Sequence, residues 1–389
     1  MEHTFWIWYP GDFELYHAMK QNFSRVERGF GWPAFWKSEG FRNRVAFRRT
    51  YELEQETSFT VFSNAIGHVL VTWENGEKKY PFGKKITAGP GKVKVSIHAG
   101  CVEAFPCAYV QGKVIHSDKT WMAEDYSQPL VPVGVCKYFT KPEQKPTVWE
   151  YTEKECKPVK ISEVNGGVLA EFETELTAAV SVKDKRKTAL EKEKRKVVKN
   201  IENGYEGNAE EISDAGNCRK ESDSGDSCDV LEVFCGESED EALDLEHCYY
   251  SWQPDPVTNR CPCCAVRFAF IPNCKAEDVE ITAFYQYVDF PKRASFKCSD
   301  QKLNKIWEVA EHTFRLCSGI FFLDGVKRDK WIWSGDAYQS FFVNQYLLAD
   351  PDIDQRTLLA LRGNNPMTRH INTIMDYSLF WILGVLYHY

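Results

Sequence analysis

The chain lacks long apolar runs, an export signal and an excess of basic residues. No stretch of about 18 uncharged apolar residues occurs in its 389 residues, so the sequence predicts no membrane-spanning helix. The opening MEHTFWIWYPGDFELYH carries charges throughout, which excludes the pattern of a signal peptide. A net charge of −8 argues against nucleic acid or an anionic membrane as a partner, because both need a basic surface. These absences predict a cytoplasmic protein.

Paired zinc knuckles are also missing, although the chain holds 14 cysteines. The densest group reads CPCCAVRFAFIPNC and contains Cys261, Cys263, Cys264 and Cys274. Zinc sites usually combine two C-x₂-C pairs, or one pair with histidines. This group has no second pair, so we expect reduced cysteines in the core or in turns, and no metal site.

Aromatic residues are abundant, at 14% of the chain. Sugar-binding sites use such rings as stacking platforms, but large β-sandwich cores bury them as well. Composition therefore leaves both roles open. The length of 389 residues is too great for one core and predicts two or three domains.

Two regions show the short alternating pattern of antiparallel strands. Residues 40–135 predict a β-sandwich, of the kind that binds carbohydrate, and residues 160–292 predict a second β-sandwich. We interpret residues 136–159, which contain TKPEQKP, as a linker. The aromatic segment 1–39, with FWIWYP and GWPAFW, precedes both sandwiches, and we expect it to pack against a later domain.

Residues 183–227 differ from the strands on either side. A basic block is followed by an acidic block rich in Ser and Gly, almost without aromatic residues. One interpretation is an arm that binds nucleic acid or a protein partner. The composition favours the other, which is a disordered or partly helical insertion between two strands.

From residue 293 the hydrophobic pattern becomes helical. Ser299 and Asp300 are both candidate N-caps of a helix whose apolar face carries Leu303, Ile306, Trp307, Ala310 and Phe314. GDAYQSFFVNQYLLAD and DPDIDQRTLLALRG predict two more helices, with Asp350 as a start signal and Gly363 as a stop. A fourth segment, DYSLFWILGVLYHY, is apolar on almost every side, which is typical of a helix buried by neighbours. Because no later helix follows it, we interpret residues 293–389 as part of a truncated helical domain.

The loop between the first two helices, DGVKRDKWIWSGD, holds Asp324, Asp329 and Asp336. Rigid helices on both sides can bring the three carboxylates together. The basic residues of the loop can keep some carboxylates ionised, while another, shielded by a tryptophan, keeps its proton and serves as a general acid. The basic residues are Lys327, Arg328 and Lys330, and the tryptophans are Trp331 and Trp333. Glycoside hydrolysis needs such a proton donor and a second carboxylate, and tryptophan offers a sugar ring a flat apolar face. The alternative is that the aspartates are helix caps and ion-pair partners, and Asp336 lies where a first-turn acid belongs.

The same loop resembles the signature of family 78 glycoside hydrolases, the α-L-rhamnosidases, which reads roughly D-C-P-x-R-E-x-L-G-W-x-G-D. Five residues fall at matching spacings: Asp324, Arg328, Trp333, Gly335 and Asp336. FFLDGVKRDKWIWSGDAYQS, NTIMDYSLFWI and the order of the domains are also similar to a branch of that family. The resemblance implies a bacterial enzyme with two antiparallel β-sandwich domains, followed by an (α/α)₆ barrel of which residues 293–389 supply the first helices. It also implies hydrolysis of terminal non-reducing α-L-rhamnose with inversion and without a cofactor or metal.

By this resemblance Asp329 is the general acid, while Asp324, Arg328, Trp333 and Asp336 bind the sugar. The family's acid is a glutamate, so the reach of Asp329 is shorter by about 1.5 Å, roughly one C–C bond. A misplacement of about 1 Å can lower a rate roughly a hundredfold. The family's catalytic base lies in the second half of a barrel that needs roughly 300 to 350 residues. No residue of this chain is assigned to that base.

Three functions therefore remain open. The first is an α-L-rhamnosidase, or a fragment of one, whose partner is a rhamnose-containing glycoside or oligosaccharide. The second is a non-catalytic carbohydrate-binding fragment, and the third is an (α/α)₆ glycosidase that acts on another sugar. A homodimer is also left open, because a partner chain would cover the apolar last helix.

Overall fold

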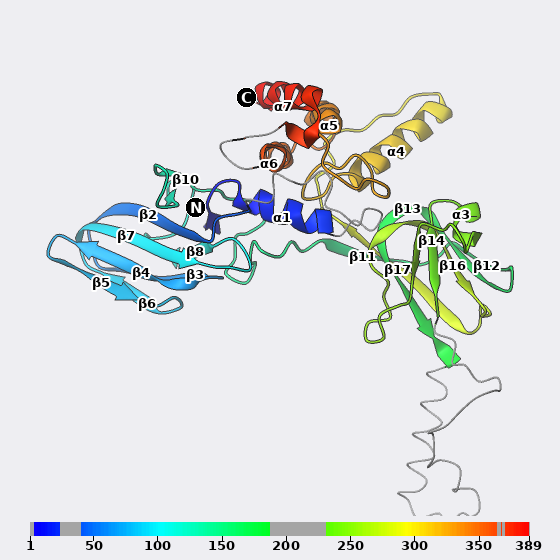
Figure 1. The fold of residues 1–389 in the computed structure, drawn as a ribbon, viewed down its shortest axis with the longest axis horizontal. Coiled ribbons are helices and arrows are strands. Elements are labelled where there is room, and N and C mark those ends of the chain that lie inside the picture. The colour runs from blue at the N-terminus through cyan, green and yellow to red at the C-terminus, as the bar shows by residue number, and fades with distance from the viewer. Residues whose placement is uncertain (1–3, 24–39, 187–230, 364–366, 368–369, 389) are drawn as a thin grey trace, which may run out of the picture. The chain divides into compact units, whose positions relative to one another are not determined.

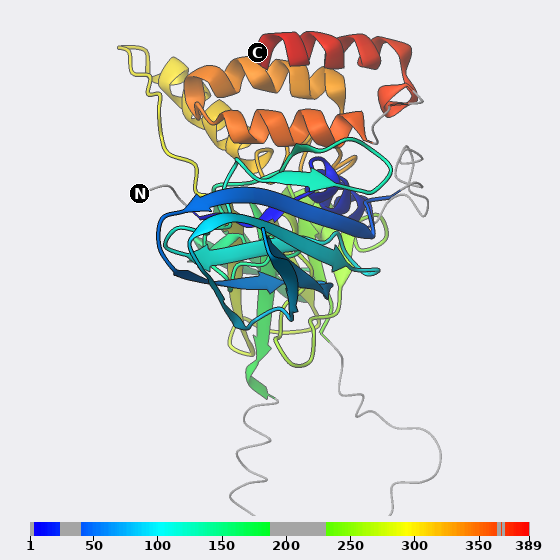
Figure 2. The ribbon, with the colours of Figure 1, turned by 90° about the vertical axis from the view of Figure 1, so that its left-hand side faces the viewer.

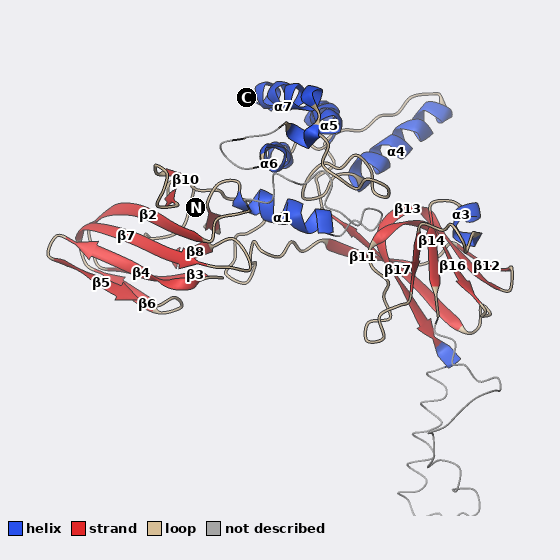
Figure 3. Cartoon of the chain, viewed as in Figure 1, coloured by secondary structure: helices blue, strands red, loops and turns tan. Residues whose placement is uncertain are grey.

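The structure, a computed structural model, describes residues 4–23, 40–186, 231–363, 367 and 370–388. Three antiparallel sheets and six α-helices lie within these ranges (Figure 3). The chain divides into two compact units. Unit 1 comprises Met1–Glu150 and Val288–Tyr389, and unit 2 comprises Tyr151–Tyr287. Two sets of strands are followed along the chain by the main group of helices, so the predicted multidomain β + α class is confirmed.

Unit 1 contains two sheets packed face to face (Figure 1). One sheet joins, in spatial order, β1 (Ile7–Trp8), β8 (Cys107–Gly112), β3 (Thr57–Ser63) and β6 (Lys85–Ala88). The other joins β10 (Val131–Pro132), β9 (Met122–Glu124), β2 (Arg44–Leu53), β7 (Gly91–Gly100), β4 (Ile66–Trp73) and β5 (Gly76–Tyr80). Alternate residues of both sheets, such as Phe47 and Phe59, are buried in one core. The period-two pattern of the sequence thus builds a β-sandwich.

The aromatic N-terminal segment adds a strand and a helix to unit 1. Strand β1 pairs with β8, and Trp8 exchanges two backbone hydrogen bonds with Gly134. Helix α1 (Asp12–Phe23) follows and packs against α6 (Pro351–Arg362). The Trp8 ring stacks on Phe13 of α1 with centroids 5.0 Å apart, so the aromatic residues serve here as core. The GWPAFW part of this segment lies outside the described residues.

Unit 2 is built on one continuous sheet of seven strands, where the sequence predicted a separate sandwich. The spatial order is β11 (Thr152–Cys156), β17 (Val279–Tyr287), β13 (Gly167–Asp184), β16 (Cys264–Pro272), β14 (Val233–Gly236) and β15 (Tyr250–Trp252), and β12 (Lys160–Val164) also pairs with β13. A short helix, α3 (Glu239–Leu243), completes the unit. Strand β13 is long enough to pair with β12 along its first part and with β17 along its second, which joins all the strands.

Two predicted boundaries shift in unit 2. Residues 152–156, which the sequence placed in a linker, form the edge strand β11 because they pair with β17. Lys183 and Asp184, expected at the start of the insertion, still belong to β13 and pair with Glu280 and Val279. The predicted insertion from residue 187 to 227 lies outside the described residues.

The clustered cysteines of unit 2 occupy the places expected of them. Cys261, Cys264 and Cys274 are buried, and Cys263 is partly buried. Within the described ranges, no three His, Cys, Asp or Glu side chains are grouped so as to hold a metal ion.

The C-terminal part of unit 1 forms four helices, as the periodicity predicted. They are α4 (Gln301–Leu316), α5 (Ser334–Leu347), α6 and α7 (Met375–His388), with the short 3₁₀ turn η2 (Ile371–Thr373) before the last. Asp300 caps α4 and Asp350 caps α6, each accepting hydrogen bonds from first-turn N–H groups. Gly363 ends α6 with a φ of 69°, in the left-handed region that favours glycine. Helix α5 begins at Ser334, one residue before the segment GDAYQSFFVNQYLLAD, so Asp336 lies in its first turn.

Burial of the helices differs from the sequence pattern at two places. Leu303 and Ile306, predicted on the buried face of α4, are about half exposed, and no residue of that helix is fully buried. Helix α7 packs on α5 and α6 along one side only (Figure 2), so Leu379 and Leu386 stay exposed. No helix among the described residues is long and apolar enough to cross a membrane.

Gly384 allows the close packing of α7. A Cβ at this position would lie 2.8 Å from the ring of Phe341 and 3.2 Å from Leu358, both of which are buried. Gly384→Ala adds helix propensity worth about 1 kcal/mol, but overpacking typically costs about 1–3 kcal/mol. We expect a net loss in the free energy of unfolding, measured as a lower urea midpoint at unchanged slope. The matched variant Leu383→Ala, on the exposed side, changes the midpoint little, and a more stable Gly384→Ala protein would contradict the packing.

Candidate active site

The loop that carries the three aspartates is fixed at both ends by hydrogen bonds to neighbouring helices. The backbone N–H of Phe322 donates to Thr357 Oγ1 of α6 at 3.1 Å. At the other end, the N–H of Ser334 donates to Asn372 Oδ1 at 2.9 Å, and Asn372 Nδ2 donates to the carbonyl of Ile332 at 2.9 Å. The tip of the loop is therefore held between rigid elements, as a preorganised site requires.

Asp324 closes the loop on itself. Its backbone N–H donates to the carbonyl of Trp331 at 3.0 Å, and its Oδ1 accepts the N–H of Trp331 at 2.9 Å. Lys330, just before Trp331, has a φ of 46°, and its carbonyl accepts a hydrogen bond from Gln21 of α1 at 3.1 Å. The Trp331 side chain is fully buried. Asp324 thus has a structural role as well as a place in the acid cluster.

Asp329 and Trp333 are linked directly. The indole Nε1–H of Trp333 donates to Asp329 Oδ2 at 3.1 Å. The Trp333 ring also contacts Tyr377 of α7 edge to face, with centroids 5.7 Å apart. An added Cβ on Gly335 would lie 3.3 Å from the Tyr377 ring, so a glycine suits this close approach. Tyr377 joins the site although sequence reasoning did not select it; the segment NTIMDYSLFWI, which carries it, was the available signal.

Two of the three carboxyls, those of Asp324 and Asp336, have raised pKa values. Burial raises the pKa of Asp324 to about 6, and the charges of Asp329 and Asp336 add to the rise, while backbone N–H groups of Trp331 and Gly325 oppose it. Burial, then the charge of Asp329, also raises the pKa of Asp336. The sequence predicted that the carboxyls of this loop would differ in pKa, so that one of them keeps its proton. With its pKa raised to about 6, Asp324 keeps its proton to a higher pH than an ordinary aspartate does.

The start of helix α5 bears on whether the aspartates of the loop are helix caps or acids of a site. Helix α5 has Trp333 at its N-cap and no side-chain capping bond, so Asp336 is a first-turn acid and not the cap. Burial, then the charges of Asp336 and Asp324, raises the pKa of the Tyr377 hydroxyl. Arg328 lies on the same loop with an exposed side chain. Asp324, Asp329, Trp333 and Asp336 are brought together, with Tyr377 beside them.

The raised pKa of Asp324 predicts a pH-dependent gain in stability for Asp324→Asn. The carboxyl titrates near 4 in the unfolded chain and near 6 in the folded chain, so its ionisation destabilises the native state as pH rises through that interval. Asn keeps the oxygen that accepts from Trp331. Thermal unfolding of the variant at pH 8 is therefore expected to report a gain on the order of 1 kcal/mol, reduced by partial solvent exposure. At pH 4 the two proteins have equal stability.

Asp289→Asn, at an exposed position of the same unit, is the matched control and leaves stability unchanged at both pH values. A gain for Asp324→Asn that is the same at pH 4 and pH 8, or a loss at pH 8, contradicts the raised pKa.

No protein-family model matches this chain, and no curated protein matches it. Among solved structures, the α-L-rhamnosidase from Dictyoglumus thermophilum is 13% identical with a TM-score of 0.40, covering 89% of this chain and 45% of that one. The GH78 rhamnosidase of Bacillus sp. GL1 is 13% identical with a TM-score of 0.38, covering 89% and 42%. The rhamnosidase from Klebsiella oxytoca with rhamnose bound is 15% identical with a TM-score of 0.41, covering 61% and 52%. The chain thus spans about half, or less, of the length of these structures.

Proposed function

We propose that this chain belongs to a glycoside hydrolase that removes terminal non-reducing α-L-rhamnosyl residues with inversion. The observation that carries the proposal is that Asp324, Asp329 and Asp336 influence one another's charge on one loop, where Trp333 donates to Asp329 and the spacing resembles the rhamnosidase signature. Three carboxylates beside an indole ring suit a sugar, because carboxylates accept hydrogen bonds from hydroxyl groups and the ring covers an apolar face. The proposal includes α4 to α7 as helices of an (α/α)₆ barrel.

In this proposal Asp329 is the general acid. It donates its proton to the glycosidic oxygen as the bond from that oxygen to the anomeric carbon breaks, and water adds to the opposite face. The indole N–H of Trp333, 3.1 Å from Asp329 Oδ2, orients the carboxyl and stabilises the carboxylate that remains. A second group must take the proton of the water, and no described residue is assigned to that task.

Asp324, Asp336 and Arg328 bind the sugar. Asp324 and Asp336 accept hydrogen bonds from its hydroxyl groups, and their charges stabilise the positive charge that develops at the ring in the transition state. Arg328 has an exposed side chain, so it contacts the sugar by donating from the rim of the site. The Tyr377 ring supports Trp333 from the side.

The role of Asp329 as acid predicts how activity depends on the leaving group. Asp329→Asn is expected to lower kcat about 10²–10⁴-fold on an alkyl α-L-rhamnoside, whose leaving oxygen needs a proton. The loss is smaller on 4-nitrophenyl α-L-rhamnoside, because nitrophenolate leaves without full protonation. Release of rhamnose from both substrates by the purified chain measures the two losses. Asp376→Asn, at an exposed position in the first turn of α7, is the control and keeps the parent activity.

Asp329→Glu tests whether the length of the side chain limits the rate. It keeps a carboxylic acid at this position and restores the length of the family's glutamate. If Asp329→Glu releases rhamnose as fast as the parent chain or faster, the result supports position 329 as the place of the general acid. An equal loss on both substrates after Asp329→Asn contradicts an acid role. Binding of rhamnose without release would instead indicate a carbohydrate-binding function, and release only from other aryl glycosides would indicate another sugar. Proton NMR of the first-formed anomer tests inversion.

A further inference from the structure

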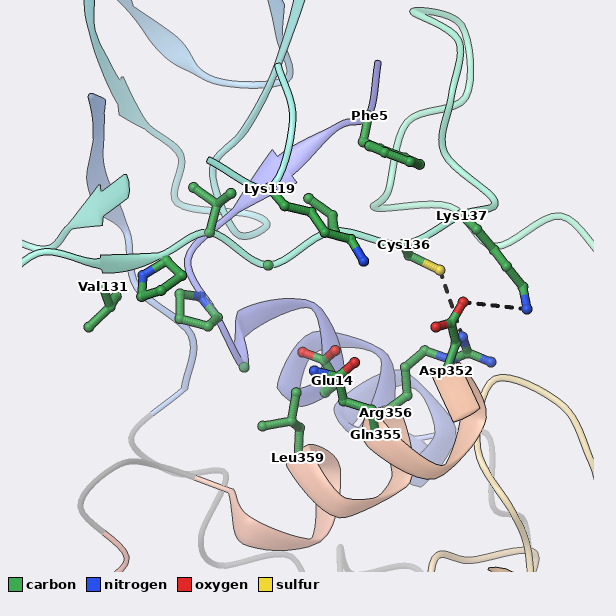
Figure 4. A pocket seen from close by; sticks show the side chains of 16 residues that line it. Phe5, Glu14, Lys119, Val131, Cys136, Lys137, Asp352, Gln355, Arg356 and Leu359 are labelled. Atoms are coloured by element: carbon green, nitrogen blue, oxygen red, sulfur yellow. Dashed lines mark hydrogen bonds and ion pairs between the residues drawn. The ribbon is translucent and has the colours of Figure 1, made fainter. Parts of the chain in front are cut away.

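A pocket lies in unit 1, where residues 131–137 pass over α1 and α6 (Figure 4). Its volume is about 540 Å³, within the usual range for small-molecule sites. Apolar side chains such as Val133 and Leu359 form much of its wall. None of its lining residues belongs to the aspartate loop. Two buried charged side chains, Glu14 from α1 and Arg356 from α6, also line it.

Arg356 has an unused hydrogen-bond donor in this pocket. Its side chain is almost fully buried; Nε donates to the carbonyl of Ile320 at 2.8 Å, and Nη1 contacts Cys136 Sγ at 3.7 Å. Burial raises the pKa of the Cys136 thiol, so neither of these two partners is an anion. Nη2 is buried and has no hydrogen-bond partner among the described residues. A buried guanidinium N–H without an acceptor is unfavourable, so this position suits an added acceptor.

Glu14 has the complementary group, an unused acceptor. Its side chain is 5% exposed, and Oε2 has no hydrogen-bond partner within the described ranges. Burial raises the pKa of this carboxyl to about 7, against the opposing charges of Arg356 and Arg362. The pocket wall therefore presents a donor and an acceptor that are both buried and both unsatisfied.

The charged side chains that line the pocket are three cations, Lys119, Lys137 and Arg356, and two carboxylates, Glu14 and Asp352. Lys137 pairs with two carboxylates, Asp350 at 2.5 Å and Asp352 at 3.4 Å, so its charge is already neutralised by the protein. Lys119 is exposed and extends over the pocket from the opposite wall (Figure 4). Arg356 and Lys119 together exceed the single charge of Glu14. A monoanion balances the pocket, whereas a dianion meets two carboxylates in the same wall.

We propose that this pocket binds a small hydroxylated monocarboxylate, a molecule of the size and chemistry of a sugar acid. Its carboxylate accepts from Arg356 Nη2, and Lys119 balances the charge from the rim. One of its hydroxyl groups donates to Glu14 Oε2. Its carbon skeleton packs on the apolar wall. This inference is independent of the proposed glycosidase activity, because it uses none of the residues of the aspartate loop.

Calorimetric titration of the full chain with D-glucuronate tests the proposal. For a ligand of this size we expect a Kd of about 1 mM. D-glucose, which lacks the carboxylate, and acetate, which lacks the hydroxyl groups, are each expected to bind at least about tenfold more weakly. Inorganic phosphate at pH 8 is expected not to displace glucuronate, because it is mainly a dianion.

Variants locate the site. Lys119→Met removes an exposed charge, so the chain keeps its fold, and the affinity for glucuronate falls about three- to tenfold. Lys113→Met, an exposed lysine outside the pocket, leaves the affinity unchanged. Three results overturn the proposal: no heat of binding with about 20 mM glucuronate, equal binding of glucose and glucuronate, or equal affinities for the Lys119→Met and Lys113→Met proteins. If there is no heat of binding, only water forms hydrogen bonds with Arg356 Nη2 and Glu14 Oε2.

Discussion

The arrangement of unit 1 depends on the burial of its first aromatic strand. Trp8 is hydrogen-bonded to the sandwich through its backbone and stacked on Phe13 through its ring, so it fixes where α1 begins. From α1, His17 contacts the carbonyl of Pro146 at 2.7 Å, and Gln21 holds the aspartate loop. Large aromatic side chains bury 150–250 Å² each, roughly, which makes such a strand a strong anchor. Without it, neither the pocket at Glu14 nor the loop would keep its shape.

In the aspartate loop, unlike in the aromatic strand, neighbouring side chains repel one another, because they are carboxylates of the same charge. Asp324 and Asp336 both have raised pKa values, and the charge of Asp329 contributes to each rise. Such repulsion is tolerated only where the surroundings hold the backbone, here through Asn372 and Thr357. A loop that is stabilised at its ends and destabilised at its tip is typical of a site selected for chemistry.

Local patterns were sufficient for much of the fold and for part of the site. The capping residues Asp300 and Asp350 and the stop at Gly363 act within one helical turn, so sequence reasoning found them. Strand alternation likewise located most strands of both units. The cluster of Asp324, Asp329, Trp333 and Asp336 lies within thirteen consecutive residues, and a short loop between two helices keeps such residues close.

Contacts between distant segments decided the rest. The sequence did not indicate that α4 would leave Leu303 exposed, because periodicity shows which face is apolar but not whether anything covers it. It did not indicate that β13 would join all of unit 2 in one sheet, since pairing partners depend on strand length and register. Tyr377 contacts Trp333, and Glu14 lines one pocket with Arg356, only because packing brings together helices far apart in the chain. Composition and spacing determined which chemistry the chain carries; tertiary packing decided which of its polar groups are buried, and burial gives those groups their altered proton affinity and their unused hydrogen bonds.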